Sequence, residues 1–244
     1  MTFQVGLIGN GGIVLASDTR ITIDGSIQEE SEGSAAYIGE SGRKIEFNQR
    51  IAVSCADDLL FARKVAKRII AELTDADLLN EGAAHSAIDK IITEALSEKR
   101  KAQWLIAIKC AEWHLFKCRL SPIDPANPEG EWDKSCALRF DWQVAGHFAN
   151  PAIFLSKYND DFLSPEQLIP LAAHMVVSAN FFNSQGIEGL DIVLCDAIGV
   201  QRLSMASIAA LKQLSKNIDR NTSDILLGYE QKYTFAPNST GGSL

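Results

Sequence analysis

The stretch Thr2–Asp18 reads TFQVGLIGNGGIVLASD, and the predicted fold is organised around it. Apolar residues alternate with others over Phe3–Leu7, which is the period of a β-strand. The glycine-rich cluster Gly9–Gly12 is typical of a tight turn, and the apolar run Ile13–Ala16 predicts a second, more buried strand. This stretch is therefore predicted to form a β-hairpin.

The register of this hairpin decides which side chains meet at its open end. A two-residue loop, Asn10-Gly11, sets Phe3 opposite Asp18, whereas a three-residue loop that starts at Gly9 sets Thr2 opposite Asp18. We prefer the three-residue loop because it matches apolar residues of both strands on one face. The preferred register places the Thr2 hydroxyl and the Asp18 carboxylate next to each other.

Thr2 becomes a candidate nucleophile if Met1 is removed, and aminopeptidases cut methionine from small residues such as threonine. The new α-amine has a pKa of about 7.7–8.0. It can take the proton of the Thr2 hydroxyl, which is the N-terminal threonine form of nucleophile activation. The alternative interpretation of this stretch alone is an ordinary edge strand with a disordered first residue.

Composition excludes several classes of protein. The net charge of −8 argues against a nucleic-acid partner, and no apolar run is long enough to predict a membrane span or a membrane partner. We see no signal peptide, and the five scattered cysteines form no C-x-x-C pair, which favours reduced thiols and a cytoplasmic location. The four histidines lack metal-ligand spacing, so neither a metal site nor a cofactor is predicted.

The order of predicted elements has a symmetry of strands, two helices, strands, two helices and strands. After the first hairpin we expect a second hairpin over 43–54 with its turn at Asn48-Gln49, followed by a helix capped by Asp57 or Asp58. We expect helices over 59–73, 81–101, 151–158, 165–182 and 208–218, strands over 104–110, 113–119, 138–145, 190–195 and 200–204, and a loop over 121–133.

Packed as layers, this order predicts two sheets face to face with helices outside each. The predicted class is α+β, with a four-layer αββα sandwich. We expect one domain over 1–230 and a flexible tail over 231–244.

Three stretches carry a resemblance to a known family. Thr2–Arg20 resembles the opening of proteasome β-type subunits, in which a nucleophilic threonine leads into a hairpin that ends in Asp-x-Arg. Lys44–Asn48 resembles the strand that carries the family's catalytic lysine, and Val53–Asp58 resembles the turn that enters its first helix. The chain thus resembles the bacterial proteasome homologues among the N-terminal-nucleophile (Ntn) hydrolases.

The resemblance implies a role for each matching residue. It makes Thr2 the nucleophile and, through its amine, the base, while Lys44 lowers the pKa of the hydroxyl and Asp18 holds Lys44 charged and oriented. A backbone N–H near Ser54 is implied as the oxyanion donor, although the family commonly has glycine at that turn. Arg20, which closes the Asp-x-Arg motif, is implied as a support residue.

The second half of the chain departs from the family pattern. Where the family has a serine after a glycine, this chain has His147 after Gly146. Where the family has Asp-x-x-Ser-Gly-Gly, this chain has the turn Asn183–Gly189, so Asn183 or Ser184 is the predicted source of the supporting hydrogen bonds. These departures concern activity rather than fold.

The function implied by the resemblance is an N-terminal threonine peptidase subunit of a self-compartmentalising ring. Unfolded polypeptide is the implied substrate, cleaved through an acyl-enzyme on Thr2. The implied assembly is a homo-oligomeric double ring of about six or seven subunits per ring, and an ATP-dependent unfoldase partner is left open. Two alternatives are a weak or inactive scaffold of the same fold and a small-molecule amidase of the same superfamily.

Overall fold

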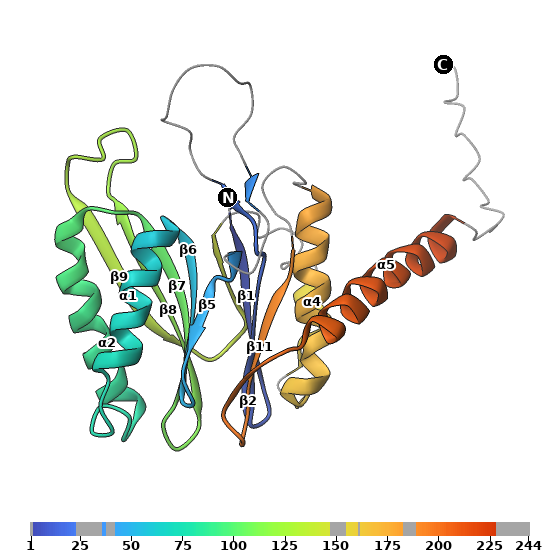
Figure 1. The fold of residues 1–244 in the computed structure, drawn as a ribbon, viewed down its shortest axis with the longest axis horizontal. Coiled ribbons are helices and arrows are strands. Elements are labelled where there is room, and N and C mark those ends of the chain that lie inside the picture. The colour runs from blue at the N-terminus through green and yellow to red at the C-terminus, as the bar shows by residue number, and fades with distance from the viewer. Residues whose placement is uncertain are drawn as a thin grey trace, which may run out of the picture.

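The computed structural model describes residues 2–22, 36–37, 42–146, 155–160, 162–182 and 189–227. In this part of the chain, two five-stranded antiparallel sheets lie face to face between two pairs of helices (Figure 1). This arrangement confirms the predicted four-layer αββα sandwich. The predicted tail lies outside the described residues.

The first sheet contains both strands of the opening hairpin at its centre. Its strands, in spatial order, are β10 (Gln143–Gly146), β1 (Phe3–Gly9), β2 (Gly12–Ser17), β11 (Asp191–Cys195) and β12 (Val200–Arg202). Its outer face is covered by α4 (Pro165–Phe182), and α5 (Met205–Leu227) packs against α4 (Figure 1). The 3₁₀-helix η3 (Ser156–Tyr158) lies between β10 and α4 in the chain.

The second sheet contains the second hairpin at one edge. Its strands, in spatial order, are β5 (Ile45–Phe47), β6 (Ile51–Asp57), β7 (Ala102–Lys109), β8 (Trp113–Pro122) and β9 (Trp132–Arg139). Its outer face is covered by α1 (Leu59–Glu72) and α2 (Glu81–Ala95), which continues into η2 (Leu96–Glu98). A separate two-stranded ladder joins β3 (Ile21–Thr22) and β4 (Ala36–Tyr37).

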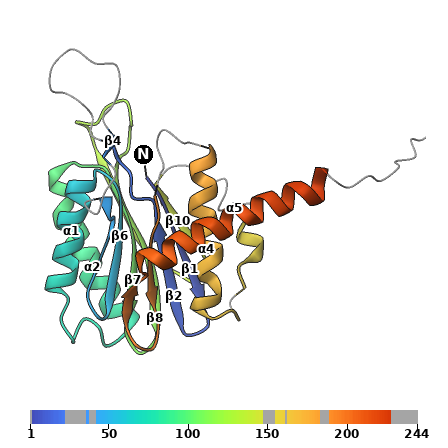
Figure 2. The ribbon, with the colours of Figure 1, turned by 45° about the vertical axis from the view of Figure 1, so that its right-hand side comes forward.

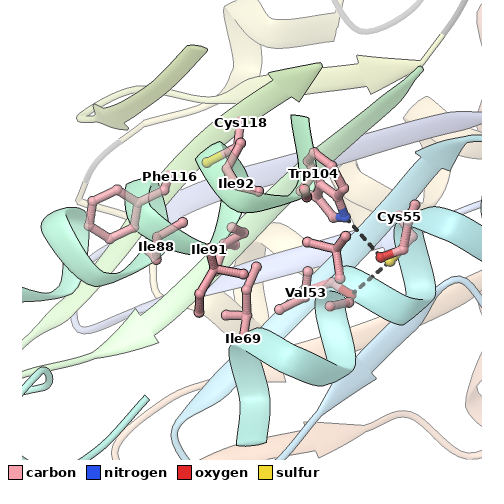
Figure 3. Packing of buried hydrophobic residues seen from close by; sticks show 14 of the residues in the cluster. Val53, Cys55, Ile69, Ile88, Ile91, Ile92, Trp104, Phe116 and Cys118 are labelled. Carbon is pink, nitrogen blue, oxygen red and sulfur yellow. Dashed lines mark hydrogen bonds between the residues drawn. The ribbon is translucent and has the colours of Figure 1, made fainter. Parts of the chain in front are cut away.

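The core between the second sheet and its helices is built from apolar side chains of α1, α2 and the sheet. Figure 3 shows isoleucines of α1 and α2 packed against Trp104 and Phe116 of the sheet. The indole N–H of Trp104 donates to the Ala62 carbonyl oxygen over 3.0 Å, so the buried ring has a polar partner. At the start of α1, the Asp58 carboxylate accepts from the Phe61 N–H over 3.1 Å, as the predicted cap requires.

The preferred register of the opening hairpin is wrong. Gln4 pairs with Ser17 and Gly9 pairs with Gly12, so the loop contains only Asn10-Gly11. Both faces of β1 and β2 are buried, and either register therefore matches apolar residues with apolar residues. The turn decides the register instead, because Gly11 adopts a φ of +85°, which glycine accepts without strain.

The predicted strand over 138–145 is also wrong, because the chain changes sheets within it. Residues up to Arg139 belong to β9 of the second sheet, whereas Gln143–Gly146 form the edge strand β10 of the first sheet. The predicted loop over 121–133 is correspondingly shorter, since β9 begins at Trp132. At the crossing, Phe140 has 79% of its surface exposed, so this apolar residue does not mark a buried strand.

A buried histidine joins α4 and α5 on the outer side of the first sheet. Helix α5 is longer than predicted, and Figure 2 shows it crossing α4 and continuing past it. His174 of α4 contacts the Ser215 hydroxyl through Nδ1 at 2.7 Å, and its Nε2 lies 3.8 Å from the Asp219 carboxylate of α5. Burial lowers the pKa of His174 below 6.5, and the Asp219 charge only partly opposes this effect.

We expect His174 to make the protein less stable in mild acid. The unfolded chain binds a proton at His174 below pH 6.5, whereas the folded chain binds it only at lower pH, so stability falls as pH drops through this window. This one group can lower the free energy of unfolding by at most about 1.4 kcal/mol for each pH unit. Urea unfolding at pH 7 and pH 5 should show a smaller loss for His174→Gln than for the wild type; equal losses would contradict the prediction.

Candidate active site

Thr2 lies immediately before β1 and is brought next to a lysine from the facing sheet. The Lys44 ammonium donates to Thr2 Oγ1 over 3.0 Å. Lys44 precedes β5, in the second hairpin, and only 1% of its surface is exposed. Thr2 has 6% of its surface exposed, so the contact between hydroxyl and ammonium is shielded from solvent.

Asp18 follows β2 and completes the cluster. Its Oδ2 lies 2.8 Å from Lys44 Nζ and accepts from the Arg20 N–H over 3.3 Å. Its Oδ1 accepts from the Phe3 N–H over 2.9 Å, while its own N–H donates to the Phe3 carbonyl oxygen over 3.1 Å. The carboxylate therefore fixes the start of β1 and the position of Lys44 together.

This geometry explains why Thr2 and Asp18 share one site although they are not paired in the hairpin. Phe3, not Thr2, lies opposite Asp18, and Lys44 bridges the Asp18 carboxylate and the Thr2 hydroxyl. The contact of Arg20 with the site is made by its backbone N–H. Asn183, Ser184 and His147, which the sequence also implicated, lie outside the described residues.

Burial shifts both charged groups of the site. It lowers the pKa of Lys44, and the nearby Asp18 carboxylate opposes that shift. It also raises the pKa of Asp18, against the opposing effects of Lys44 and of the two backbone N–H donors. Each charge would be costly to bury alone, so the two groups stabilise each other as a pair.

Ser54 lies on β6 with its backbone inside the sheet. The Cys55 N–H donates to the Lys44 carbonyl oxygen over 2.8 Å on the β5 side. Because successive N–H groups of a strand point to opposite edges, the Ser54 N–H is directed toward β7, where Ser54 pairs with Leu105. An oxyanion donor near Ser54 stays a prediction, and the Ser54 N–H itself is engaged in the ladder.

Two glutamines that the sequence analysis did not single out connect the two sheets near Thr2. The buried Gln4 of β1 donates through Nε2 to the Cys55 carbonyl oxygen of β6. Gln103 of β7 donates to the Asp57 carboxylate over 2.9 Å and accepts from the Gly146 N–H over 3.3 Å. Each glutamine is a polar residue within a largely apolar strand. This contrast is the sequence signal that could have identified them.

No family model and no curated protein matches this sequence. Solved structures do match its fold. Anbu (ancestral beta-subunit) from Yersinia bercovieri aligns with a TM-score of 0.67 at 13% identity, over 95% of this chain and 100% of that chain. An Anbu Gly-1 mutant from Hyphomicrobium sp. strain MC1 aligns with a TM-score of 0.66 at 16% identity, over 93% and 100%.

The chain has the Anbu fold. A third Anbu structure, a helical assembly of the complex from Pseudomonas aeruginosa, aligns with a TM-score of 0.65 at 12% identity, over 95% of this chain and 98% of that chain. The alignments with Anbu include nearly all of each chain, so the shared fold extends beyond the opening hairpin.

Within this Anbu fold, the described residues contain no group of three or more His, Cys, Asp or Glu side chains placed to hold a metal ion. Among the same residues, no helix combines the length and apolar character that crossing a membrane requires. The candidate site itself consists of the Thr2 hydroxyl, the Lys44 ammonium and the Asp18 carboxylate.

We expect Gly146→Ala to disturb the Thr2 site. Gly146 has a φ of +85°, and a Cβ atom there would lie 2.1 Å from the Thr2 carbonyl oxygen. Gly11 also has a φ of +85° but has open space around it, so Gly11→Ala is a matched control that introduces backbone strain alone. This strain should lower the free energy of unfolding by about 1–2 kcal/mol. Urea unfolding should show a larger loss for Gly146→Ala; equal losses would contradict a tight contact with Thr2.

Proposed function

We propose that this chain is an N-terminal threonine peptidase subunit of a proteasome-like ring. One observation carries the proposal: a buried lysine contacts the Thr2 hydroxyl at 3.0 Å and the Asp18 carboxylate at 2.8 Å. A hydroxyl beside a fixed, shielded ammonium is suited to act as a nucleophile, because the ammonium stabilises negative charge that develops on the oxygen. The Anbu fold supports the same interpretation.

In the proposed reaction, removal of Met1 exposes the α-amine of Thr2. This amine accepts the hydroxyl proton while Oγ1 attacks the carbonyl carbon of a peptide bond. The C–N bond then breaks, the proton passes to the leaving amine, and an ester remains on Thr2. Water hydrolyses the ester and regenerates the hydroxyl. Lys44 stabilises the developing alkoxide, and Asp18 keeps Lys44 in place.

The substrate that we propose is unfolded polypeptide, which enters a homo-oligomeric double ring. The helical assembly formed by the Anbu complex of Pseudomonas aeruginosa supports self-association of this fold. Leu60 of α1 has 83% of its surface exposed and Leu79, before α2, has 73%, so the outer helices present apolar side chains that a neighbouring subunit can cover. A cytoplasmic location and an ATP-dependent unfoldase partner belong to the same proposal.

Fragment release from unfolded casein tests this function. The full chain should first be checked by light scattering, which we expect to report an assembly far larger than a monomer. The assembled protein should then release peptides from casein, and its intact mass should lack Met1. An assembled protein that leaves casein intact would favour the scaffold alternative, whereas a stable monomer that hydrolyses small amides would favour the amidase.

A further inference from the structure

Two cysteines face each other across neighbouring strands of the second sheet. Cys118 of β8 pairs directly with Cys136 of β9, and their Sγ atoms lie 2.7 Å apart. In the same ladder, the Ile123 N–H donates to the Glu131 carbonyl oxygen over 2.9 Å, next to the pair of Pro122 with Trp132. Bonded and non-bonded pairs alternate along an antiparallel ladder.

The pair of Ile123 with Glu131 is hydrogen-bonded, and Cys118 with Cys136 is the fifth pair along the ladder from it. Because the two kinds of pair alternate, Cys118 and Cys136 form a non-hydrogen-bonded pair. In such pairs the Cα atoms approach to about 4.5 Å and the side chains come closer than in bonded pairs. A disulfide accepts Cα separations from about 4.4 to 6.8 Å. The ladder therefore holds the two thiols where a bond between them needs little backbone movement.

The surroundings give the two thiols different accessibility. Cys118 is buried among the apolar residues beneath α2 (Figure 3), and burial raises the pKa of its thiol well above the ordinary value. Cys136 is half-buried, with its carbonyl oxygen in contact with His85 Nε2 of α2 at 2.9 Å. An oxidant from solvent thus meets Cys136 first.

The other cysteines do not share this arrangement. Cys55 lies opposite Trp104, and Cys195 lies opposite Ile13 in the first sheet. Cys110 is half-buried like Cys136 but lies beyond the last paired residues of β7 and β8, in their turn. Cys110 therefore serves as a control for exposure without a facing thiol.

We propose that Cys118 and Cys136 are a peroxide-oxidised modification site that closes into a reversible cross-strand disulfide. The Cys136 thiol loses its proton, its thiolate attacks hydrogen peroxide, and the O–O bond breaks to give a sulfenic acid and hydroxide, which takes up the released proton to form water. The Cys118 sulfur then attacks the sulfenic sulfur, the S–O bond breaks, and the Cys118 proton leaves with the hydroxide as water. Two thiols and one peroxide give one disulfide and two waters. The new bond links β8 covalently to β9 and closes a loop that contains the hairpin tip between the two cysteines.

Thiol counting on the reduced full chain tests the site. Hydrogen peroxide is added and removed, the protein is denatured, and free thiols are blocked with N-ethylmaleimide and counted by intact mass. We expect the five adducts of the wild type to fall to three and to return to five after dithiothreitol. Tryptic mapping should find one peptide pair, linked within one chain through Cys118 and Cys136.

Two variants sharpen the test. Cys110→Ser should still lose two adducts, whereas Cys136→Ser should keep all four of its thiols free. The wild-type map decides the question even if a variant does not fold. Five adducts after peroxide, oxidation of Cys136 without a link to Cys118, or a link between two chains would each overturn the proposal.

Discussion

Thr2→Ala is expected to abolish peptide-bond hydrolysis, with a loss on the order of 10⁴-fold or more. The substitution removes only the hydroxyl and a methyl group, so the α-amine and the small second residue that permits removal of Met1 are both kept. The hydroxyl contacts Lys44 at 3.0 Å and is the atom that we propose attacks the substrate. Steady-state cleavage of a fluorogenic peptide by the assembled variant measures the loss.

Thr2→Ser is the matched control for this prediction. Serine keeps the hydroxyl and the amine, so hydrolysis should persist and differ from the wild type by far less than the alanine variant. Equal activity of Thr2→Ala and the wild type would place the nucleophile elsewhere in the chain.

Lys44→Met is expected to remove activity and to destabilise the fold at the same time. Methionine fills a similar buried volume but leaves the Asp18 carboxylate without its cation, and breaking a buried pair costs about 3–5 kcal/mol. Hydrolysis should fall to the level of Thr2→Ala because the hydroxyl loses the ammonium that stabilises its charge. Urea unfolding and peptide cleavage measure the two effects separately.

A second substitution separates the structural part of Lys44 from its chemical part. In the double variant Lys44→Met/Asp18→Asn no buried charge is left unpaired, and the amide oxygen introduced at position 18 can still accept from the Phe3 N–H. We expect much of the lost stability to return while hydrolysis stays absent. Recovery of hydrolysis together with stability would show that Lys44 acts only as a structural residue.

The layers of the fold could be predicted from the sequence because the order of strands and helices repeats, with apolar stripes in the helices now seen as α1 and α2. The register of the opening hairpin could not, since apolar residues on both faces of β1 and β2 satisfy either pairing. The decisive signal was the turn, where Asn10-Gly11 suits a two-residue loop. Weighting turn chemistry above apolar matching would have given the observed register.

Most of strand β9 could not be predicted for a related reason. Polar residues fill Asp133–Ser135, directly after a loop rich in proline, so the first part of β9 has no strand period of its own. In the structure these residues find partners on neighbouring elements: Lys134 lies 2.5 Å from Asp89 of α2, and Asp133 lies 3.3 Å from Arg119 of β8. Such partners come from tertiary structure and leave no local period in the sequence.

The sequence analysis placed Thr2 beside Asp18 through a hairpin register that is wrong, and only the family resemblance brought Lys44 to the same point. The three residues belong to two hairpins in facing sheets, and the contact between them depends on how those sheets stack. Gln4 and Gln103, which link the same sheets near Thr2, show that polar residues inside apolar strands are worth examining as part of a site.

Mass spectrometry after treatment with a peptide epoxyketone tests the central claim most directly, because this reagent bonds to both the amine and the hydroxyl of a terminal threonine. For the assembled wild type we predict a chain without Met1 that carries one inhibitor, mapped to Thr2, while Thr2→Ala carries none. An assembled wild-type protein that retains Met1 and forms no adduct would contradict the account and leave a ring or scaffold protein with the same fold.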